Sequence, residues 1–179
     1  CDDEEQDQWK QSGGQGQVYK AYCKIAGTDR RQLHAVKEPL DRDQWRGQAR
    51  EAKVYFNIDP RDHPHLAFLS DVVRFEDRPL LVMQWAEQGT LDDWIQAQAT
   101  THSSYDGADA LAAYEAERAR QALEFAIQIA RGLRSLHEDL NLVHQDLKPS
   151  NVLRFGQLIK IADFGLSCSD YGDQGKCSK

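Results

Sequence analysis

The first third of the chain alternates apolar and polar residues in short runs. Residues 17–24 and 31–37 alternate with the period of a half-buried β-strand, and the turn-forming residues 26–29 lie between them. These segments predict a β-hairpin. Two further runs, residues 68–75 and 79–84, have the same character. The N-terminal part is therefore predicted to be a small, mostly-β unit.

A spacing of three and four residues replaces this alternation after Asp43. It predicts a helix that ends at Asp59-Pro60, because proline cannot continue a helix. The apolar face of this helix is predicted to consist of Trp45, Ala49, Ala52, Tyr55 and Phe56.

A second, longer helix is predicted from Tyr114 to His137. Its buried face is predicted to consist of Ala122, Ala126, Ile129, Leu133 and Leu136.

The segments on either side of this long helix give weaker signals. Thr90, with two aspartates after it, predicts the start of a short helix. Residues 97–110 are small and polar without a period, which predicts a loop. Short apolar runs at residues 151–155 and 158–162 predict two more strands.

Charge and hydropathy exclude two classes of partner for this chain. The 179 residues include 22 basic and 29 acidic ones, which gives a net charge of −7. A general nucleic-acid binder needs a cationic face, so no nucleic-acid partner is expected. No apolar run approaches the roughly 20 residues that cross a bilayer, so we expect no membrane segment in this chain.

The cysteines and the first residues bear on the compartment. Cys1, Cys23, Cys168 and Cys177 are scattered and form no CxxC pair, which predicts reduced thiols and neither a disulfide framework nor a zinc site. The start of the chain is acidic where a signal peptide would be basic and then apolar. We therefore expect a cytoplasmic protein. Met83 is the single methionine, so we also expect the chain to be part of a longer or processed product.

Residues 11–18 (QSGGQGQV) are rich in glycine. Gly13, Gly14 and Gly16 would let backbone N–H groups approach a polyphosphate without obstruction by a Cβ. A bland hairpin turn is the alternative interpretation. A dinucleotide-binding fold is disfavoured because a strand, and no helix, is predicted to follow these glycines.

Lys37 ends a strand-like run, and Glu51 lies in the middle of the first predicted helix. Taken separately, the lysine is typical of a solvated strand end and the glutamate of an ion pair on the helix face. Together the two residues could form a buried pair that directs the lysine toward phosphates.

The segment His144–Asn151 (HQDLKPSN) carries the most specific chemistry. Asp146 can accept a proton from a hydroxyl, Lys148 can neutralise a phosphate, and the amide oxygen of Asn151 can bind a metal. Asp163-Phe164-Gly165 follows at the end of a predicted strand, and its carboxylate is a natural ligand for Mg²⁺.

In this order the landmarks resemble those of a eukaryotic protein kinase domain, from about Trp9 to Cys168. The family's G-x-G-x-x-G-x-V pattern matches at Gly13, Gly16 and Val18, whereas Gln11 stands in place of its first glycine. Lys37 matches the lysine of V-A-I-K, and Glu51 matches its helical partner.

The remaining kinase motifs follow in the family's order. H-R-D-L-K-P-x-N is present as H-Q-D-L-K-P-S-N at residues 144–151, and D-F-G is intact at residues 163–165. Met83 aligns with the gatekeeper, and residues 84–86 align with the hinge that pairs with adenine.

The resemblance implies a role for each of these residues. Asp146 would position and deprotonate the substrate hydroxyl, Lys148 would stabilise the γ-phosphate, and Lys37, oriented by Glu51, would hold the other phosphates. Mg²⁺ would be held by Asn151 and Asp163. ATP would be contacted by Gly13, Gly14, Gly16, Val18, Ala35, Lys37, Met83, Gln84, Ala86 and Leu153. A stacked spine would comprise Tyr55, Leu69, His144 and Phe164.

The resemblance also implies an α+β fold with two lobes. An acidic flank (1–8) would precede a complete β-rich N-lobe with one helix (9–83), a hinge (84–89) and a partial helical C-lobe (90–179). No Ala-Pro-Glu motif follows Gly165, so we expect the chain to end within the activation segment. Alone it is expected to have negligible activity, marginal stability and an exposed apolar face near residues 123–136 of its long helix.

Two functions are compatible with these residues. Lys148, two positions after the catalytic aspartate, is similar to the serine/threonine pattern, and residues 89–93 are similar to the tyrosine-kinase-like group. The first hypothesis is therefore a kinase that uses ATP and Mg²⁺ to phosphorylate Ser/Thr of proteins. The second is a pseudokinase or truncated nucleotide-binding scaffold, to which Gln11 and Gln145 lend some support. Gln145 cannot pair with a phosphate as the usual arginine does.

Overall fold

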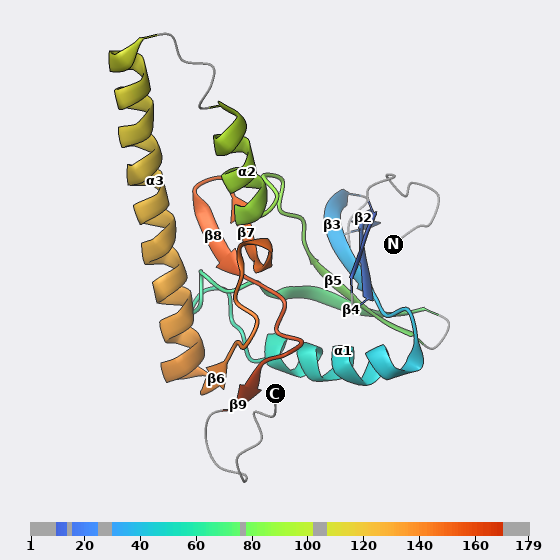
Figure 1. Ribbon diagram of the computed structural model, residues 1–179. Helices are drawn as coiled ribbons and strands as arrows, with labels where there is room; N and C mark the ends of the chain where they lie inside the picture. The colour runs from blue at the N-terminus through green and yellow to red at the C-terminus, as the bar shows by residue number, and fades with distance from the viewer. Residues whose placement is uncertain (1–9, 14–15, 25–29, 76–77, 102–106, 170–179) are drawn as a thin grey trace. The chain divides into compact units, whose positions relative to one another are not determined.

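The computed structural model describes residues 10–13, 16–24, 30–75, 78–101 and 107–169. These residues form two compact units (Figure 1). Unit 1 contains the described residues up to Asp62, together with Ala67–Trp85 and Asp163–Ser167. Unit 2 contains His63–Leu66, Ala86–Ala162 and the described residues from Cys168 onward. The domain boundaries given above stay predictions.

Unit 1 is built on a five-stranded antiparallel sheet with the order β1-β2-β3-β5-β4. The strands are β1 (Lys10–Gly13), β2 (Gly16–Lys24), β3 (Arg31–Glu38), β4 (Leu69–Phe75) and β5 (Arg78–Gln84). The four strands predicted from alternation, β2 to β5, are confirmed to within one residue at each end.

Alternation along the strands gives the sheet two different faces. One face carries a buried apolar cluster formed by Ala21, Cys23, Val36, Leu80 and Val82. The opposite face carries Val18, which is paired with Lys37, and Ala35, which is paired with Met83. Residues directly opposite each other in a ladder share a face. The sheet therefore presents four of the predicted ATP-site residues together.

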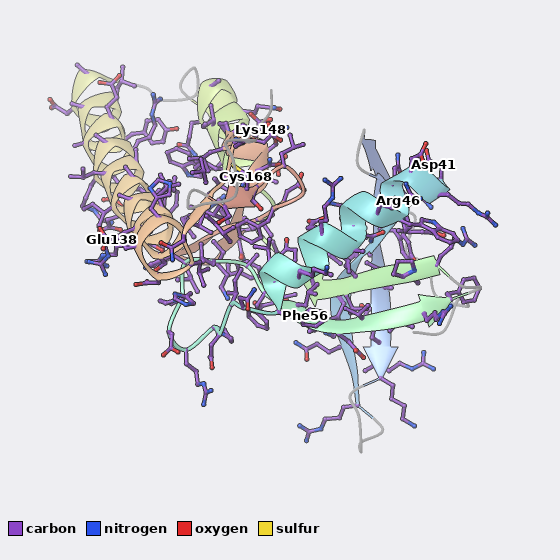
Figure 2. The ribbon with its side chains drawn as sticks, turned by 90° about the horizontal axis from the view of Figure 1, so that it is seen from below. Asp41, Arg46, Phe56, Glu138, Lys148 and Cys168 are labelled. Carbon is purple, nitrogen blue, oxygen red and sulfur yellow. The ribbon has the colours of Figure 1, made fainter. Side chains whose placement is uncertain are left out.

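Helix α1 (Arg42–Tyr55), which runs between Asp41 and Phe56 in Figure 2, belongs to unit 1 and begins with a reciprocal cap. Asp41 Oδ1 accepts a hydrogen bond from the backbone N–H of Gln44 (2.8 Å), and Gln44 Oε1 accepts one from the N–H of Leu40 (2.7 Å). These bonds satisfy donors that the first turn of a helix leaves unpaired.

The buried face of α1 differs from the predicted one. Ala52 and Tyr55 are buried as expected, but Ala49 is exposed and the side chain of Phe56 is 71% exposed. The buried positions also include Gln48 and Glu51. The apolar spacing misplaced the face because these two polar side chains bond to β3 inside unit 1.

The described part of unit 2 contains two α-helices and two small sheets. Helix α2 (Leu91–Thr101) precedes the long helix α3 (Ala108–Arg134), which ends in a π-helical turn, Ser135–Asp139. The sheets are two-stranded: β6 (Leu142–Val143) pairs with β9 (Cys168–Ser169), and β7 (Val152–Phe155) pairs with β8 (Leu158–Ile161).

The predicted helix start at Thr90 is confirmed. Thr90 Oγ1 accepts a hydrogen bond from Asp93 N (3.1 Å), and Asp93 Oδ2 accepts one from Thr90 N (2.7 Å). The predicted loop at residues 97–110 is wrong where the structure describes it, because α2 continues to Thr101 and α3 already begins at Ala108. Alanine is frequent in this segment, and its high helix propensity outweighs the missing apolar period.

Helix α3 packs through a face centred on Phe125 and Gly132. Phe125 forms a core cluster with Val152 and Ile159, and the Trp94 ring of α2 packs edge-on against it at 5.3 Å. The predicted positions Ala122 and Ala126 are exposed, so the predicted face of α3 is wrong there. Small alanines fit either side of a helix, whereas one large aromatic residue determines which side is buried.

The exposed apolar surface expected near residues 123–136 is present in part. Leu123 is 62% and Ile127 is 44% exposed, whereas Leu136 is buried. No helix within the described ranges is long and apolar enough to cross a bilayer.

The expectation of reduced thiols is wrong for both cysteines that the structure describes. Cys23 and Cys168 each take part in a disulfide bond. Scattered spacing without a CxxC pair thus did not reveal the pairing. The expected cytoplasmic location loses the support that it took from reduced thiols.

The architecture confirms the α+β fold class. A β-rich first unit with one helix is followed by a mainly helical second unit, as the kinase resemblance implies.

Candidate functional site

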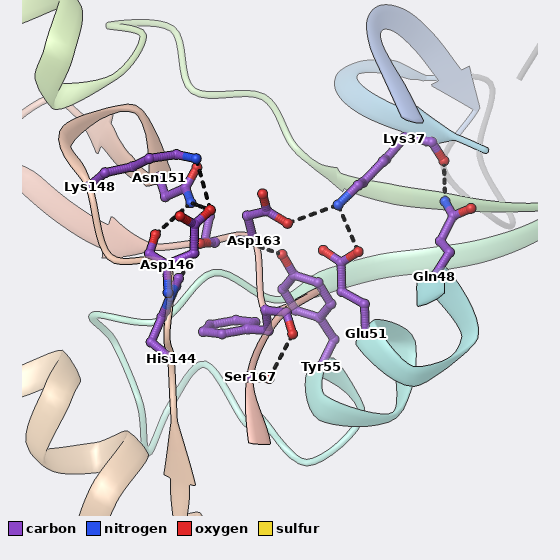
Figure 3. Close-up of polar contacts among 12 residues, drawn as sticks. Lys37, Gln48, Glu51, Tyr55, His144, Asp146, Lys148, Asn151, Asp163 and Ser167 are labelled. Carbon is purple, nitrogen blue, oxygen red and sulfur yellow. Dashed lines mark hydrogen bonds and ion pairs between the residues drawn. The ribbon is translucent and has the colours of Figure 1, made fainter. Parts of the chain in front are cut away.

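Lys37 on β3 lies between two carboxylates of unit 1 (Figure 3). Its Nζ is 2.7 Å from Glu51 Oε2 on α1 and 3.0 Å from Asp163 Oδ1, which follows β8 in the chain. Lys37 is only 6% and Glu51 only 2% exposed. The interpretation of Lys37 as a solvated strand end is therefore wrong.

Gln48 anchors α1 to the same strand. Its Nε2 donates a 2.6 Å hydrogen bond to the backbone carbonyl of Lys37. Because Gln48 and Glu51 are three residues apart, both side chains leave α1 on one face. The sequence did not single out Gln48, since an isolated glutamine on a helix carries no local signal.

The charges around Lys37 keep it protonated. Burial acts to lower the pKa of Lys37, but the carboxylates of Glu51 and Asp163 outweigh burial and raise the pKa above its ordinary value. Burial raises the pKa of Glu51, and the Lys37 ammonium opposes that shift. Glu51 Oε1 is buried without a hydrogen-bond partner. One ammonium thus compensates two acidic groups, and the cluster can accommodate further positive charge.

Contacts with α1 fix the Asp163-Phe164 backbone. Asp163 has a left-handed φ of 65°, and its N–H donates to the hydroxyl of Tyr55 (3.3 Å). The Phe164 ring packs edge-on against the Tyr55 ring, with centroids 5.0 Å apart. Phe164 is 1% exposed. Two members of the predicted spine therefore touch, and their contact holds the Asp163 carboxylate at Lys37.

The remaining predicted ATP-site residues of unit 1 are described in part. Val18, Ala35 and Met83 share the sheet face of Lys37, and Gln84 pairs with His34 at the end of β5. Gly16 has a φ of 122°, and a Cβ there would lie 2.5 Å from the carbonyl oxygen of Glu38. Gly16 is thus required for the close approach of β2 to β3, whatever it does for a ligand.

The other two glycines of the loop add less. Gly13 ends β1 opposite Gly16 in the ladder. Gly14 lies outside the described residues.

His144 positions the second cluster, which lies in unit 2. Its Nε2 donates to the carbonyl oxygen of Ala162 (3.0 Å), and its Nδ1 accepts from the N–H of Asp146 (3.3 Å). Both ring nitrogens are thereby used, and the residue is 2% exposed. Gln145, which lies between His144 and Asp146 in the chain, has a left-handed φ of 63°. The imidazole acts as a structural bracket for the loop.

Asp146 is the centre of this cluster (Figure 3). Its Oδ2 lies 2.8 Å from Lys148 Nζ and 3.1 Å from Asn151 Nδ2, which also donates to the Asp146 carbonyl (2.8 Å). The Lys148 hydrogen bond holds the pKa of Asp146 below its ordinary value. The carboxylate is therefore ionised at neutral pH and can accept a hydrogen bond from a hydroxyl.

Ala86 and Leu153 belong to unit 2. Ala86 is buried and its carbonyl accepts a hydrogen bond from Gly89 N (3.0 Å). Leu153 pairs with Lys160 across β7 and β8 and forms a bridge with Thr90.

The donor chemistry fits Mg²⁺. Asn151 donates through its amide nitrogen to Asp146, and its amide oxygen makes no hydrogen bond within the part of the chain that the structure describes. Asp163 supplies a carboxylate whose Oδ1 accepts a hydrogen bond from the Lys37 ammonium. Amide and carboxylate oxygens are the ligands that this hard ion prefers. Each of the two residues, one in unit 2 and one in unit 1, thus offers an oxygen of the kind that Mg²⁺ prefers.

A family model of protein tyrosine and serine/threonine kinases matches residues 7–179. The chain belongs to the protein kinase family. A leucine-rich repeat receptor protein kinase of Arabidopsis thaliana is 30% identical over 158 residues, which cover 87% of this kinase chain and 12% of that protein.

Relatives from animals match a similar part of this kinase. Mitogen-activated protein kinase kinase kinase 7 of Drosophila melanogaster is 30% identical over 151 residues, which cover 82% of the chain and 20% of that protein. An interferon-induced, double-stranded RNA-activated protein kinase of Rattus norvegicus is 28% identical over 171 residues, 87% of the chain and 30% of that protein. The kinase chain thus spans less than a third of the length of each of these relatives.

Proposed function

We propose that this chain is the nucleotide-binding part and catalytic loop of a protein kinase that transfers the γ-phosphate of ATP to serine or threonine hydroxyls of proteins. The observation that carries the proposal is the buried Lys37 ammonium, held 2.7 Å from Glu51 and 3.0 Å from Asp163. Burial of an isolated charge costs folding free energy, and a buried ion pair can often be replaced by apolar residues without loss of stability. A buried ion pair is therefore better explained by a ligand than by stability.

Lys37 has the properties of a phosphate-binding group. It stays protonated because its pKa is raised by the two carboxylates, and Gln48 and Glu51 fix its position. Binding of ATP would replace part of the Asp163 contact by contacts to phosphate oxygens. When bound, Mg²⁺ would supply charge neutralisation of the phosphates, and Asn151 and Asp163 would hold it.

Asp146 and Lys148 have the properties of the groups that act on the hydroxyl. The lowered pKa of Asp146 makes it a weak base, so that it orients the hydroxyl as an acceptor and takes the proton as transfer proceeds. Lys148 Nζ, bonded to Asp146 Oδ2 and half exposed, can move to the transferring phosphate.

Serine/threonine specificity is the finer part of the proposal. Lys148 lies two residues after Asp146, and relatives include a probable serine/threonine-protein kinase of Arabidopsis thaliana that is 30% identical over 158 residues. Tyrosine kinases commonly carry alanine or arginine near this position.

The test measures transfer from [γ-³²P]ATP to casein by the full-length protein with Mg²⁺, followed by phosphoamino-acid analysis. We expect phosphoserine or phosphothreonine. Asp146→Asn should lower kcat by about 10²–10⁴-fold, because it removes the acceptor of the hydroxyl proton. The Kd for ATP should change little, since Asp146 is assigned no contact with the nucleotide.

Asp62→Asn removes one exposed carboxylate and serves as the charge-matched control. Labelling confined to tyrosine would contradict the specificity. ATP binding without any transfer by the wild-type protein would favour the pseudokinase scaffold instead.

A further inference from the structure

Four cations form a line along α1. Arg42, Arg46, Arg50 and Lys53 are all exposed, and we name them the basic stripe. At 3.6 residues per turn they fall within an arc of about 80° and extend over about 17 Å of the helix axis. Figure 2 shows α1 between Asp41 and Phe56, with Arg46 in its first half.

The basic stripe lies opposite the face that α1 buries. The buried residues Gln48, Glu51 and Tyr55 are centred about half a helical turn away from it. The stripe therefore takes no part in packing α1 on the sheet, and a ligand on it would leave the Lys37–Glu51 pair in place.

Within the described residues, no carboxylate forms an ion pair with the stripe. The Arg42 guanidinium lies over the Trp45 ring, 5.9 Å from its centroid. The N-cap carboxylate of Asp41 is engaged with the backbone N–H of Gln44 and does not pair with the stripe. Like charges four residues apart destabilise a helix, so that stability does not account for this arrangement.

We propose that the basic stripe is a docking surface for an acidic segment of a partner protein. The four exposed cations have no carboxylate partner among the described residues, so the stripe is complementary to acidic and not to basic partners. About five residues of extended peptide cover 17 Å, and carboxylates at every second residue then fall near successive cations.

The shape of the stripe distinguishes this partner from a single phosphate. A single phosphate is held by arginines that converge on it, whereas these side chains leave the helix at successive turns. A nucleic acid is instead an outcome of the test below, in which an oligothymidylate competes with the acidic peptide. The proposal does not depend on phosphoryl transfer, because it concerns binding alone.

The test is fluorescence anisotropy of the 179-residue chain with a fluorescein-labelled peptide of four Glu-Ser repeats. A peptide of four Gln-Ser repeats is the uncharged control. Wild-type chain should bind the acidic peptide, and added salt should weaken binding because exposed charges are screened. Arg46→Gln/Arg50→Gln should weaken binding about tenfold, the sum of two exposed charge pairs.

Arg118→Gln/Arg131→Gln removes the same charge from exposed positions of α3 and should change the Kd less than about twofold. Circular dichroism of each variant checks that the fold is kept, and Arg46→Lys/Arg50→Lys should bind like wild type. Equal weakening by both Gln pairs, or unchanged binding by Arg46→Gln/Arg50→Gln, would overturn the proposal. The proposal would also be overturned if an eight-nucleotide oligothymidylate displaced the labelled peptide at the same concentration as the unlabelled peptide does.

Discussion

At the scale of residues, the sequence motifs predicted the Lys37–Glu51 pair but not the hydrogen bonds that hold it in place. The Lys37–Glu51 pair was predictable because each residue fits a motif of the family. The Gln48 bond to the Lys37 carbonyl and the Tyr55 hydroxyl contact with Asp163 were not predictable. Lys37 and Asp163 are 126 residues apart in sequence, and no local pattern encodes which side chains meet over that separation.

Gln145 leads to a prediction about regulation. It is exposed, has a φ of 63°, and carries a neutral side chain where most kinases have an arginine. Because an amide cannot form the charged bidentate pair with a phosphate, activity should not depend on a phosphorylated activation segment through this position. Phosphatase-treated and untreated full-length protein should show equal kcat toward casein. A large loss after phosphatase treatment would contradict this.

At the scale of elements, strands were easier to predict than helix faces. Along the strands of the large sheet every second side chain points to the buried face, and this alternation is visible in the sequence. On α1 the sequence favoured Phe56, which is exposed, over Gln48, which is buried. On α3 it favoured alanines over the side that Phe125 determines. Apolar periodicity therefore predicts the wrong helix face in two situations. In one, polar side chains form hydrogen bonds inside a unit; in the other, the side chains are small enough to fit on either face.

Gly132 allows α3 to pack closely on its neighbours. A Cβ at this position would lie 2.9 Å from the His65 carbonyl oxygen and 3.0 Å from Ile161 Cδ1. The same carbonyl accepts a hydrogen bond from Ile161 N (2.9 Å), so it cannot move freely. Gly132→Ala should lower the free energy of unfolding by about 1 kcal/mol, since the steric cost of about 1–3 kcal/mol exceeds the gain in helix propensity.

Gly47→Ala is the matched control in α1, because nothing lies within 4 Å of a Cβ there. It should raise the free energy of unfolding by about 0.5–1 kcal/mol. Urea unfolding of both variants measures the sign of each change in the free energy of unfolding. Stabilisation by Gly132→Ala would show that the close approach is absent in solution.

The cap of α2 leads to a pH-dependent prediction. The hydrogen bonds from the backbone N–H and hydroxyl of Thr90 hold the pKa of Asp93 below its ordinary value. A lowered pKa in the folded state stabilises the fold above the ordinary pKa, and this contribution disappears as pH falls through the lowered value. Asp93→Asn should therefore cost about 1 kcal/mol at pH 7, and the difference from wild type should shrink toward pH 3.

Asp92→Asn tests the same first turn without the Thr90 bonds, since Asp92 accepts from Gln96 instead. Urea titrations at pH 7, 5, 4 and 3 compare the variants. A deficit of Asp93→Asn that is independent of pH, or equal to that of Asp92→Asn, would contradict the assigned cap.

At the scale of the whole molecule, the chain carries two polar clusters whose central groups have opposite charge. In unit 1 a buried ammonium lies between two carboxylates, and in unit 2 a carboxylate lies between an ammonium and an amide. The first is suited to phosphate and metal, the second to a hydroxyl. The order of motifs predicted both sets, whereas the charges and hydrogen bonds within each set required the structure. The marginal stability expected for the chain alone stays a prediction, with Leu123 and Ile127 as exposed apolar residues that would contribute to it.

The central claim is that the Lys37–Glu51–Asp163 cluster is a nucleotide and metal site. The most direct test is isothermal titration of the 179-residue chain with ATP in the presence and absence of Mg²⁺. The wild-type chain should bind ATP saturably and more tightly with Mg²⁺. Lys37→Met should raise the Kd at least about tenfold, because it removes a charged hydrogen-bond donor to the phosphates.

Lys53→Met removes an exposed cation from α1 and should leave the Kd unchanged, and Asp163→Asn should abolish the gain from Mg²⁺. The account is contradicted if the folded wild-type chain shows no saturable binding of Mg-ATP, or if Lys37→Met binds it as tightly as wild type.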